Sequence, residues 1–215
     1  MLRGRLITIV MIGNIFMNHN YNFWKKIWDS KGNSDSTDLL FLDGYEHLGL
    51  DFDSSEICSK ILEELETKKG DSILEVGCGA GFLAREMQHL DYLGVDYSSP
   101  IIEKHKKLFP DHSVLTSESS NLPFEDGSFD YAFCFGLFQY LPGYEYAEKT
   151  IQEMTRVSRK AVLLGDLKDK TTRETHFVFP KDVLRDKKFT FTSCFYGSND
   201  VYRYNAILRK KNDLE

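Results

Sequence analysis

Three glycines at alternate positions, Gly77, Gly79 and Gly81, follow a short and mostly apolar run over 73–76. Glycine lets the backbone approach a ligand closely, and the N–H groups at the start of a helix can face that ligand. Asp96 ends the next apolar run, where a carboxylate can accept hydrogen bonds from ribose hydroxyls. A strand, a glycine turn, a helix, a second strand and an acid in this order predict a nucleoside-binding site in an α/β sheet.

The spacing of these glycines argues against a dinucleotide as the ligand. The dinucleotide fingerprint G-x-G-x-x-G would place its third glycine at position 82, which is Phe82. The pattern here is G-x-G-x-G, and Glu75 precedes it. In these residues the chain resembles the class I S-adenosylmethionine-dependent methyltransferases. Segment 75–81 is similar to the first motif of that family and segment 94–98 to the second, and the resemblance is good over roughly residues 71 to 166.

The resemblance implies S-adenosylmethionine as the cofactor and assigns residues to it. Segment 118–130 is similar to the part of the family that meets the adenine ring, although many members carry Asp-Ala where this chain has Glu118 and Ser119. A carboxylate there can accept from the adenine amino group, and the next backbone N–H can donate to a ring nitrogen. Tyr21 and Trp24 precede the core and are expected to form part of a lid. The predicted cofactor-binding residues are Glu75, Gly77, Cys78, Gly79, Gly81, Asp96, Tyr97, Glu118, Ser119, Phe135, Tyr21 and Trp24.

Methyl transfer is an in-line displacement in which the cofactor supplies the leaving group, so the protein chiefly positions the reactants and excludes water. Tyr140 is expected to face the acceptor and to attract a sulfonium by cation–π contact, the alternative being packing against the next helix. Asp166, His176 and His47 are candidates for assisting proton removal. The predicted catalytic residues are Asp166, His176 and Tyr140, and no cluster shows the spacing of metal ligands. The other histidines of the core are expected at the surface: His89, His105 and His112.

Apolar patterns place these residues on alternating strands and helices. Strands are expected near 72–76, 92–96, 112–116, 129–135 and 160–166, and helices near 80–89, 99–108 and 144–157. Such alternation with short connections predicts a parallel sheet with helices on both faces. Two later runs, 189–196 and 201–208, predict an antiparallel hairpin. The resemblance accordingly implies a Rossmann-like methyltransferase fold, a seven-stranded mostly parallel sheet that ends in a C-terminal antiparallel hairpin.

The segment before this core divides into three parts. Residues 6–16 follow Arg3 and Arg5 and are mostly apolar, but they are too few to span a bilayer as a helix. We expect residues 1–16 to be a leader or an extension from an alternative start. Residues 17–70 are expected to form a helical lid, with a short helix near 23–28 and a second helix that begins with a capping box at Asp53 and ends at 68–70. Residues 71–215 are expected to form the methyltransferase core.

The composition limits the function. The net charge of −6 and the absence of a long basic block favour a small-molecule acceptor over nucleic acid. Four widely spaced cysteines indicate free thiols in a reducing, cytoplasmic compartment, with Cys78 and Cys134 buried. We expect transfer of a methyl group to an O or N atom of a small molecule by a monomer or homodimer without stable membrane insertion. The alternatives are a methyltransferase acting on RNA or protein and a non-catalytic regulatory or scaffold protein that binds the cofactor.

Overall fold

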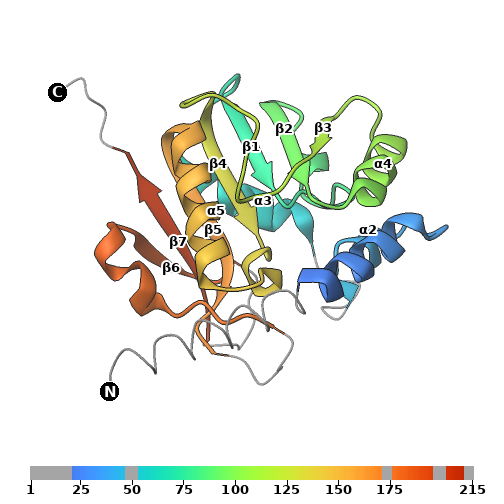
Figure 1. Cartoon of the computed structure of the whole chain (residues 1–215). Helices are drawn as coiled ribbons and strands as arrows, with labels where there is room; N and C mark the ends of the chain where they lie inside the picture. The colour runs from blue at the N-terminus through green and yellow to red at the C-terminus, as the bar shows by residue number, and fades with distance from the viewer. Residues whose placement is uncertain (1–20, 47–52, 171–175, 196–201, 211–215) are drawn as a thin grey trace, which may run out of the picture.

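Figure 1 shows a computed structural model, which describes residues 21–46, 53–170, 176–195 and 202–210. Its sheet contains seven strands in the order β3-β2-β1-β4-β5-β7-β6. The first five strands of this order are parallel, and β7 runs antiparallel to both of its neighbours. The predicted fold class is therefore confirmed, including the hairpin at the C-terminal end.

The strands fall close to the predicted ranges. Their bounds are Ser72–Val76 (β1), Asp91–Asp96 (β2), Ser113–Thr116 (β3), Phe129–Phe135 (β4), Ser158–Lys168 (β5), Thr190–Ser193 (β6) and Arg203–Arg209 (β7). The α-helices that carry labels are Leu39–Leu42 (α2), Ser54–Leu65 (α3), Ser99–Leu108 (α4) and Tyr144–Val157 (α5), and residues 21–33 are also helical. Three short 3-10 helices complete the list: Ala84–Glu86 (η2), Phe138–Tyr140 (η3) and Lys181–Lys187 (η4).

Helices cover both faces of the sheet, as the long apolar runs of its strands require. On one face, Ala147, Ile151 and Met154 of α5 pack with Leu74 of β1 in one buried cluster. On the other face, α3 packs with Ile73 in a second cluster. Figure 1 shows α5 in front of β4 and β5, with α3 behind the sheet. This arrangement fixes the carboxyl ends of the parallel strands at one edge.

The helical residues 21–33 pack against the start of α4 at this edge. A Cβ atom added to Gly32 would lie 2.4 Å from the backbone carbonyl carbon of Pro100, so the two backbones approach as closely as glycine permits. The Ser98 hydroxyl donates to Asp29 at 2.7 Å and caps α4 through the N–H of Ile101. This contact brings the N-terminal segment over the carboxyl ends of β1 and β2.

Several local predictions need correction. The expected helix over 80–89 is only the 3-10 helix η2, because positive φ angles at Gly79 and Gly81 delay the helical turn. Helix α3 ends at Leu65, earlier than predicted, because Glu66 takes up the left-handed conformation. Asp53 caps α3 by accepting from the N–H of Ser55, without a capping box. The predicted leader, residues 1–16, lies outside the described residues, and within the described ranges no helix is long and apolar enough to cross a bilayer.

Candidate active site

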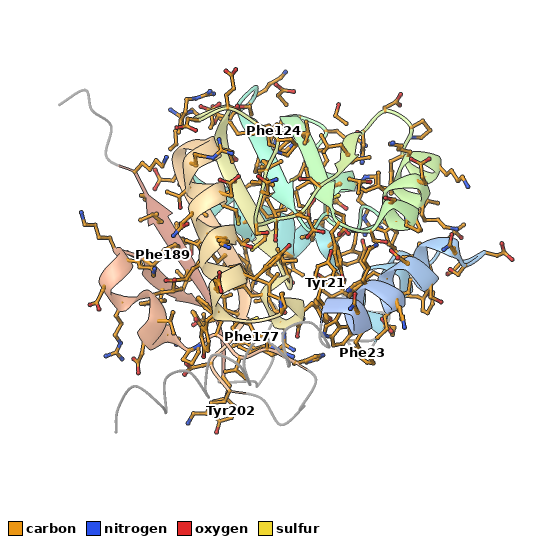
Figure 2. All side chains as sticks on the ribbon, in the orientation of Figure 1. Tyr21, Phe23, Phe124, Phe177, Phe189 and Tyr202 are labelled. Atoms are coloured by element: carbon orange, nitrogen blue, oxygen red, sulfur yellow. The ribbon has the colours of Figure 1, made fainter. Side chains whose placement is uncertain are left out.

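A pocket opens at the carboxyl ends of β1, β2 and β4, the place where ligands bind in open α/β sheets. Nine of the predicted cofactor-binding residues line it, together with Tyr140. They are Tyr21, Glu75, Gly77, Cys78, Gly79, Asp96, Tyr97, Ser119 and Phe135. Figure 2 shows Tyr21 at this edge, between the N-terminal helix and the sheet. The other three predicted residues do not line it: Gly81, Trp24 and Glu118. Trp24 lines a neighbouring pocket, and Glu118 bonds to the lining residues Tyr21 and Tyr146.

The glycine turn is held in a conformation that side chains would disturb. Gly77 and Gly79 have φ angles of 81° and 53°, in the left-handed region that favours glycine. The N–H groups of Gly77 and Cys78 both donate to the carbonyl of Val95, at 2.7 and 3.0 Å. These bonds tie the turn to the end of β2 and expose its inner surface to the pocket.

His105 supports the same turn from α4, and its predicted surface position is wrong. Its side chain is fully buried, and Nδ1 lies 2.9 Å from the carbonyl oxygen of Gly79 while Nε2 lies 3.0 Å from Nδ1 of His112. Because a carbonyl only accepts, Nδ1 carries the proton and Nε2 accepts from His112. Burial lowers the pKa of His105 to about 4, which keeps the ring neutral. The helical position alone did not reveal that this side chain reaches the turn.

Asp43 is a residue of the site that the sequence did not predict. It follows α2 and places its carboxylate over the glycine turn, accepting from the N–H of Ala80 at 2.6 Å and of Phe82 at 2.8 Å. These are the donors expected at the start of the predicted helix, so Asp43 acts as its N-terminal cap from a distant segment. Desolvation raises the pKa of Asp43 to about 7, and nearby Asp96 adds to this shift. Asp43 thereby couples α2 to the turn.

Asp96 stands at the end of β2, as predicted. One carboxylate oxygen accepts from the N–H of Ser98 at 2.9 Å and the other from the N–H of Gly79 at 3.3 Å. Withdrawal from water raises the pKa of Asp96 to about 6, although these two hydrogen bonds lower it. The carboxylate is fixed in direction, faces the pocket and retains acceptor capacity for the two hydroxyls of a ribose.

Glu118 closes the side of the pocket next to β3. Its two oxygens accept from the hydroxyls of Tyr21 and Tyr146, each at 2.5 Å. Tyr21 also meets the ring of Tyr97 edge to face, with ring centroids 5.6 Å apart. Tyr21 of the N-terminal helix thus contacts both Glu118 and Tyr97, two of the predicted cofactor-binding residues. Tyr146 of α5 was not among the predicted site residues, because its position on a helix does not show that its hydroxyl reaches Glu118.

The electrostatic character of the pocket suits a cationic ligand. Asp43, Glu75 and Asp96 all line it. Glu75 accepts from the hydroxyl of Tyr92 at 2.7 Å, and burial raises its pKa well above the usual range. Within the described ranges, no group of three or more His, Cys, Asp or Glu side chains could hold a metal ion. Asp43 and Asp96 accept hydrogen bonds from the glycine turn, and a positive charge bound beside them would favour their ionised forms.

Tyr140, one of the three predicted catalytic residues, lines the pocket beside Gln139. Its ring meets those of Trp24 and Trp28 edge to face, at 4.6 and 5.1 Å between centroids. Trp28 also lines the pocket. The hydroxyl of Tyr45 lies 3.5 Å from the carbonyl oxygen of Phe135. Tyr45, Trp28 and Tyr140 all line the pocket, and we call these three side chains the aromatic wall.

The two base candidates are held by other charged groups. The carboxylate of Asp166 is buried and forms an ion pair with Arg203, and Asp166 itself has a φ of 57°. His176 Nδ1 lies 2.9 Å from the ammonium of Lys168. Because an ammonium only donates, Nδ1 is the acceptor and the proton of the neutral ring is on Nε2. His47, the third candidate, lies outside the described residues.

The fold and the pocket together define a Rossmann-like α/β protein with a nucleoside site at the β1–β4 edge. A family model described as a methyltransferase domain matches residues 74–164. The demethylmenaquinone methyltransferase of Staphylococcus saprophyticus is 30% identical over 157 residues, which are 67% of this chain and 65% of that protein. The chain thus spans slightly less than two thirds of the length of this relative.

Two solved structures share the fold. The phosphoethanolamine N-methyltransferase 1 of Haemonchus contortus, in complex with phosphoethanolamine and S-adenosylhomocysteine, gives a TM-score of 0.68 at 14% identity and covers 88% of this chain and 48% of its own. The magnesium protoporphyrin IX methyltransferase of Synechocystis PCC 6803, with bound S-adenosylmethionine, gives a TM-score of 0.57 at 13% identity. It covers 93% of this chain and 97% of its own. Residues 74–164 therefore match a methyltransferase domain, and the fold is that of the S-adenosylmethionine-dependent methyltransferases.

The residues of the pocket fit the cofactor of this family. Gly79 lets the Asp43 carboxylate approach the turn, since a Cβ there would come within 2.3 Å of one of its oxygens. Asp96 would accept from ribose hydroxyls, and the other carboxyl groups would lie beside the ammonium and sulfonium charges. The residues that line this pocket are therefore of the types that would hold S-adenosylmethionine.

The raised pKa of Asp43 predicts how its substitution depends on pH. The folded chain keeps a proton on this group up to about pH 7, whereas the ordinary pKa of an aspartate is 3.8, so ionisation destabilises the folded state across this window. The stability of the wild type should therefore fall relative to Asp43→Asn as the pH rises from about 4 to about 7, and then level off. Urea unfolding of both proteins at a series of pH values measures this difference.

Asp53→Asn is the matched control, because hydrogen bonds to Ser55 lower the pKa of this exposed cap. The stability of the wild type should therefore rise relative to Asp53→Asn as the pH rises through the range in which Asp53 ionises. This is the opposite of the change expected for Asp43. The lowered pKa of His105 acts equally in all three proteins and cancels in the differences. A gain of wild-type stability over Asp43→Asn between about pH 4 and 7 would contradict the assigned environment.

Proposed function

We propose that the chain transfers the methyl group of S-adenosylmethionine to an O or N atom of a small-molecule acceptor. The observation that carries the proposal is the meeting, in one pocket, of the glycine turn, the Asp96 carboxylate and the aromatic wall around Tyr140. The first two suit the cofactor and the third suits an acceptor next to it. The net charge of −6 and the acidic lining support a small molecule over RNA.

Several groups would hold the cofactor. Asp96 would accept from the ribose hydroxyls, and the backbone at Gly77 and Gly79 would face the methionyl end. Tyr97 and Ser119 would contact the adenine from the side that Glu118 closes. The cofactor supplies an electrophilic methyl group on a positively charged sulfur.

The remaining residues would orient the acceptor and exclude water. Tyr140 presents its ring to the pocket, where it would attract positive charge by cation–π contact. Trp28 and Tyr45 wall off the same side. The hydrogen bonding of Asp166 and His176 favours positioning over proton removal, so we propose that rate enhancement comes mainly from alignment in a dry pocket.

Asp96→Ala should weaken binding of S-adenosylhomocysteine at least tenfold, about 1.4 kcal/mol, because a charge-assisted contact to the ribose is lost. The fold should persist, since this side chain bonds only to the nearby N–H groups of Gly79 and Ser98. Calorimetric titration measures the affinity. Asp91→Ala, at the exposed start of the same strand, is the control and should bind normally. Unchanged affinity in folded Asp96→Ala would remove Asp96 from the site.

Transfer of a labelled methyl group from S-adenosylmethionine to a panel of phenols, amines and carboxylates tests the reaction itself. Product with the wild type, and much less with Asp96→Ala at subsaturating cofactor, is the expected result. Tight cofactor binding with no turnover on any member of a broad panel would instead favour a regulatory cofactor-binding protein.

A further inference from the structure

One buried polar side chain of the active-site pocket has a hydrogen-bonding atom that the protein itself does not use. Gln139 lies in η3, shortly after β4, and only 7% of its surface is exposed. The Nε2 group of its carboxamide donates to the carbonyl of Gly136 at 3.1 Å. Among the described residues, no donor forms a hydrogen bond with Oε1 of Gln139. This oxygen is therefore available to a ligand.

The available oxygen is exposed beside the aromatic wall. In the part of the chain that the structure describes, every fully buried side-chain nitrogen or oxygen has a hydrogen-bond partner. Because Oε1 of Gln139 has none, it belongs to the small part of this residue that is exposed. Gln139 lines the active-site pocket and a neighbouring pocket, and Trp28 and Tyr140 line both of them. The oxygen thus lies where the proposed function places the acceptor.

The carboxamide of Gln139 is held in one orientation. A carbonyl only accepts, so the NH2 group of the carboxamide must face Gly136 and Oε1 must point away from it. The backbone is also fixed, because the carbonyl of Gln139 accepts from the N–H of Phe177 at 2.8 Å, a residue labelled in Figure 2. The preceding Phe138 is buried and packs against Phe179. A hydrogen bond to this fixed oxygen requires little further ordering of the protein.

Gln139 also lies close to the place that the proposed function gives to the methyl group. The glycine turn would face the methionyl end of the cofactor, and a Cβ at Gly77 would lie 3.1 Å from Cδ1 of Leu137. Leu137 is the N-cap of η3, the same short helix that carries Gln139. All three residues line the active-site pocket. An acceptor atom next to the methyl group would therefore be near the carboxamide.

A carboxamide oxygen suits one kind of nucleophile. It accepts a hydrogen bond but is too weak a base to take up a proton, and a phenol is a good nucleophile only after its proton is lost. A neutral amine carries both an N–H group and a lone pair, so it can donate to Oε1 and attack without prior loss of a proton. Positive charge then develops on the nitrogen. This charge strengthens the bond to Oε1 and the attraction to the ring of Tyr140, so both act most in the transition state.

We propose that the acceptor is a neutral amine whose N–H group donates to Oε1 of Gln139 while its lone pair faces the methyl group. The bond between nitrogen and the methyl carbon forms as the bond between sulfur and that carbon breaks, and S-adenosylhomocysteine is the leaving group. The methylated nitrogen is then cationic and releases a proton to water. This inference rests on the proposed function, and it narrows the acceptor atom from O or N to nitrogen.

The first test measures equilibrium binding to protein saturated with S-adenosylhomocysteine, by NMR titration. The probes are aniline and fluorobenzene, which share an aromatic ring that suits the aromatic wall and differ in the N–H donor. Aniline is neutral at pH 7. Wild-type protein should bind aniline about tenfold more tightly than fluorobenzene, because only aniline can donate to Oε1 of Gln139. Equal binding of the two probes, or no measurable binding of aniline, would overturn the proposal.

Variants separate the role of Oε1 from the bond between Nε2 and Gly136. Gln139→Met removes both groups and should remove the preference for aniline. Gln139→Glu loses the donor to Gly136 but keeps an acceptor oxygen, so it should keep the preference. Loss of the preference in both variants would show that Gln139 acts only through Gly136. Gln152→Met, at an exposed position of α5, is the control and should behave as wild type. Thermal unfolding checks the fold, and if Gln139→Met does not fold, Gln139→Glu and the wild-type comparison still decide.

Transfer of a labelled methyl group to amines and to phenols of the same shape tests the choice of nitrogen. Amines should give product and phenols little, and Gln139→Met should lower kcat on the amine about tenfold without weakening binding of S-adenosylmethionine. The two proposals fail in different ways. Product from phenols but not from amines leaves methyl transfer standing and rejects the amine acceptor. No product from any amine or phenol rejects methyl transfer, and the amine assignment with it.

Discussion

Gly79→Ala is expected to weaken binding of S-adenosylmethionine by about 2 kcal/mol, roughly thirtyfold. The new Cβ would lie 2.3 Å from a carboxylate oxygen of Asp43, which cannot stay where it is. Moving the carboxylate breaks its hydrogen bonds to the N–H groups of Ala80 and Phe82 and disturbs the turn that faces the ligand. Calorimetric titration of the variant measures the loss.

Gly70→Ala separates this effect from simple backbone strain. Gly70 also has a positive φ, 86°, but nothing lies within 4 Å of the added Cβ. Both variants therefore suffer the strain of a left-handed alanine, about 1 kcal/mol of stability, whereas only Gly79→Ala displaces Asp43. Gly70→Ala should bind the cofactor normally. Equal loss in the two variants would show that the contact between Asp43 and the turn does not matter for binding.

Asp166→Ala is expected to lower the free energy of unfolding by about 3 kcal/mol, because it leaves the buried guanidinium of Arg203 without this carboxylate. Alanine would also be strained at a φ of 57°, where aspartate and asparagine are better tolerated. Urea unfolding measures the change. The loss should appear without any ligand, since the ion pair joins β5 to the start of β7.

Two further variants identify the cause. Asp166→Asn keeps a residue that tolerates the backbone conformation and should lose less stability than Asp166→Ala. The double variant Asp166→Ala with Arg203→Met removes both charges and should recover part of the loss. A stable Asp166→Ala protein with reduced turnover would contradict this account and restore Asp166 as a candidate base.

Much of the fold could be predicted because strong local signals agree. The five parallel strands have long apolar runs, and Ser98 with the following proline marks the start of α4 as observed. The helix expected after the glycine turn is only the 3-10 helix η2, because positive φ angles at Gly79 and Gly81 delay the helical turn. The cap of this turn could not be predicted, because it is not local. The N–H groups at its start are satisfied by Asp43, which comes from a segment about forty residues earlier and without clear periodicity.

The same limit applies to the site. Asp96 and the glycines are found by spacing, because the motif is continuous along the chain and the sheet fixes its geometry. His105 looked like a surface residue, since a helix position indicates a face but not what the side chain reaches. Asp166 lies near the end of β5, but its partner Arg203 reaches it only through the pairing of β5 with β7. The contact of His176 with Lys168 likewise depends on how the segment after β5 folds back.

The central claim is that the pocket at the end of β1 binds S-adenosylmethionine rather than a dinucleotide. Calorimetric titration of the purified protein with S-adenosylmethionine, S-adenosylhomocysteine and NAD tests it most directly. The account predicts dissociation constants in the micromolar range for the two adenosyl compounds and no binding of NAD. Binding of NAD alone, or of none of the three, would contradict it.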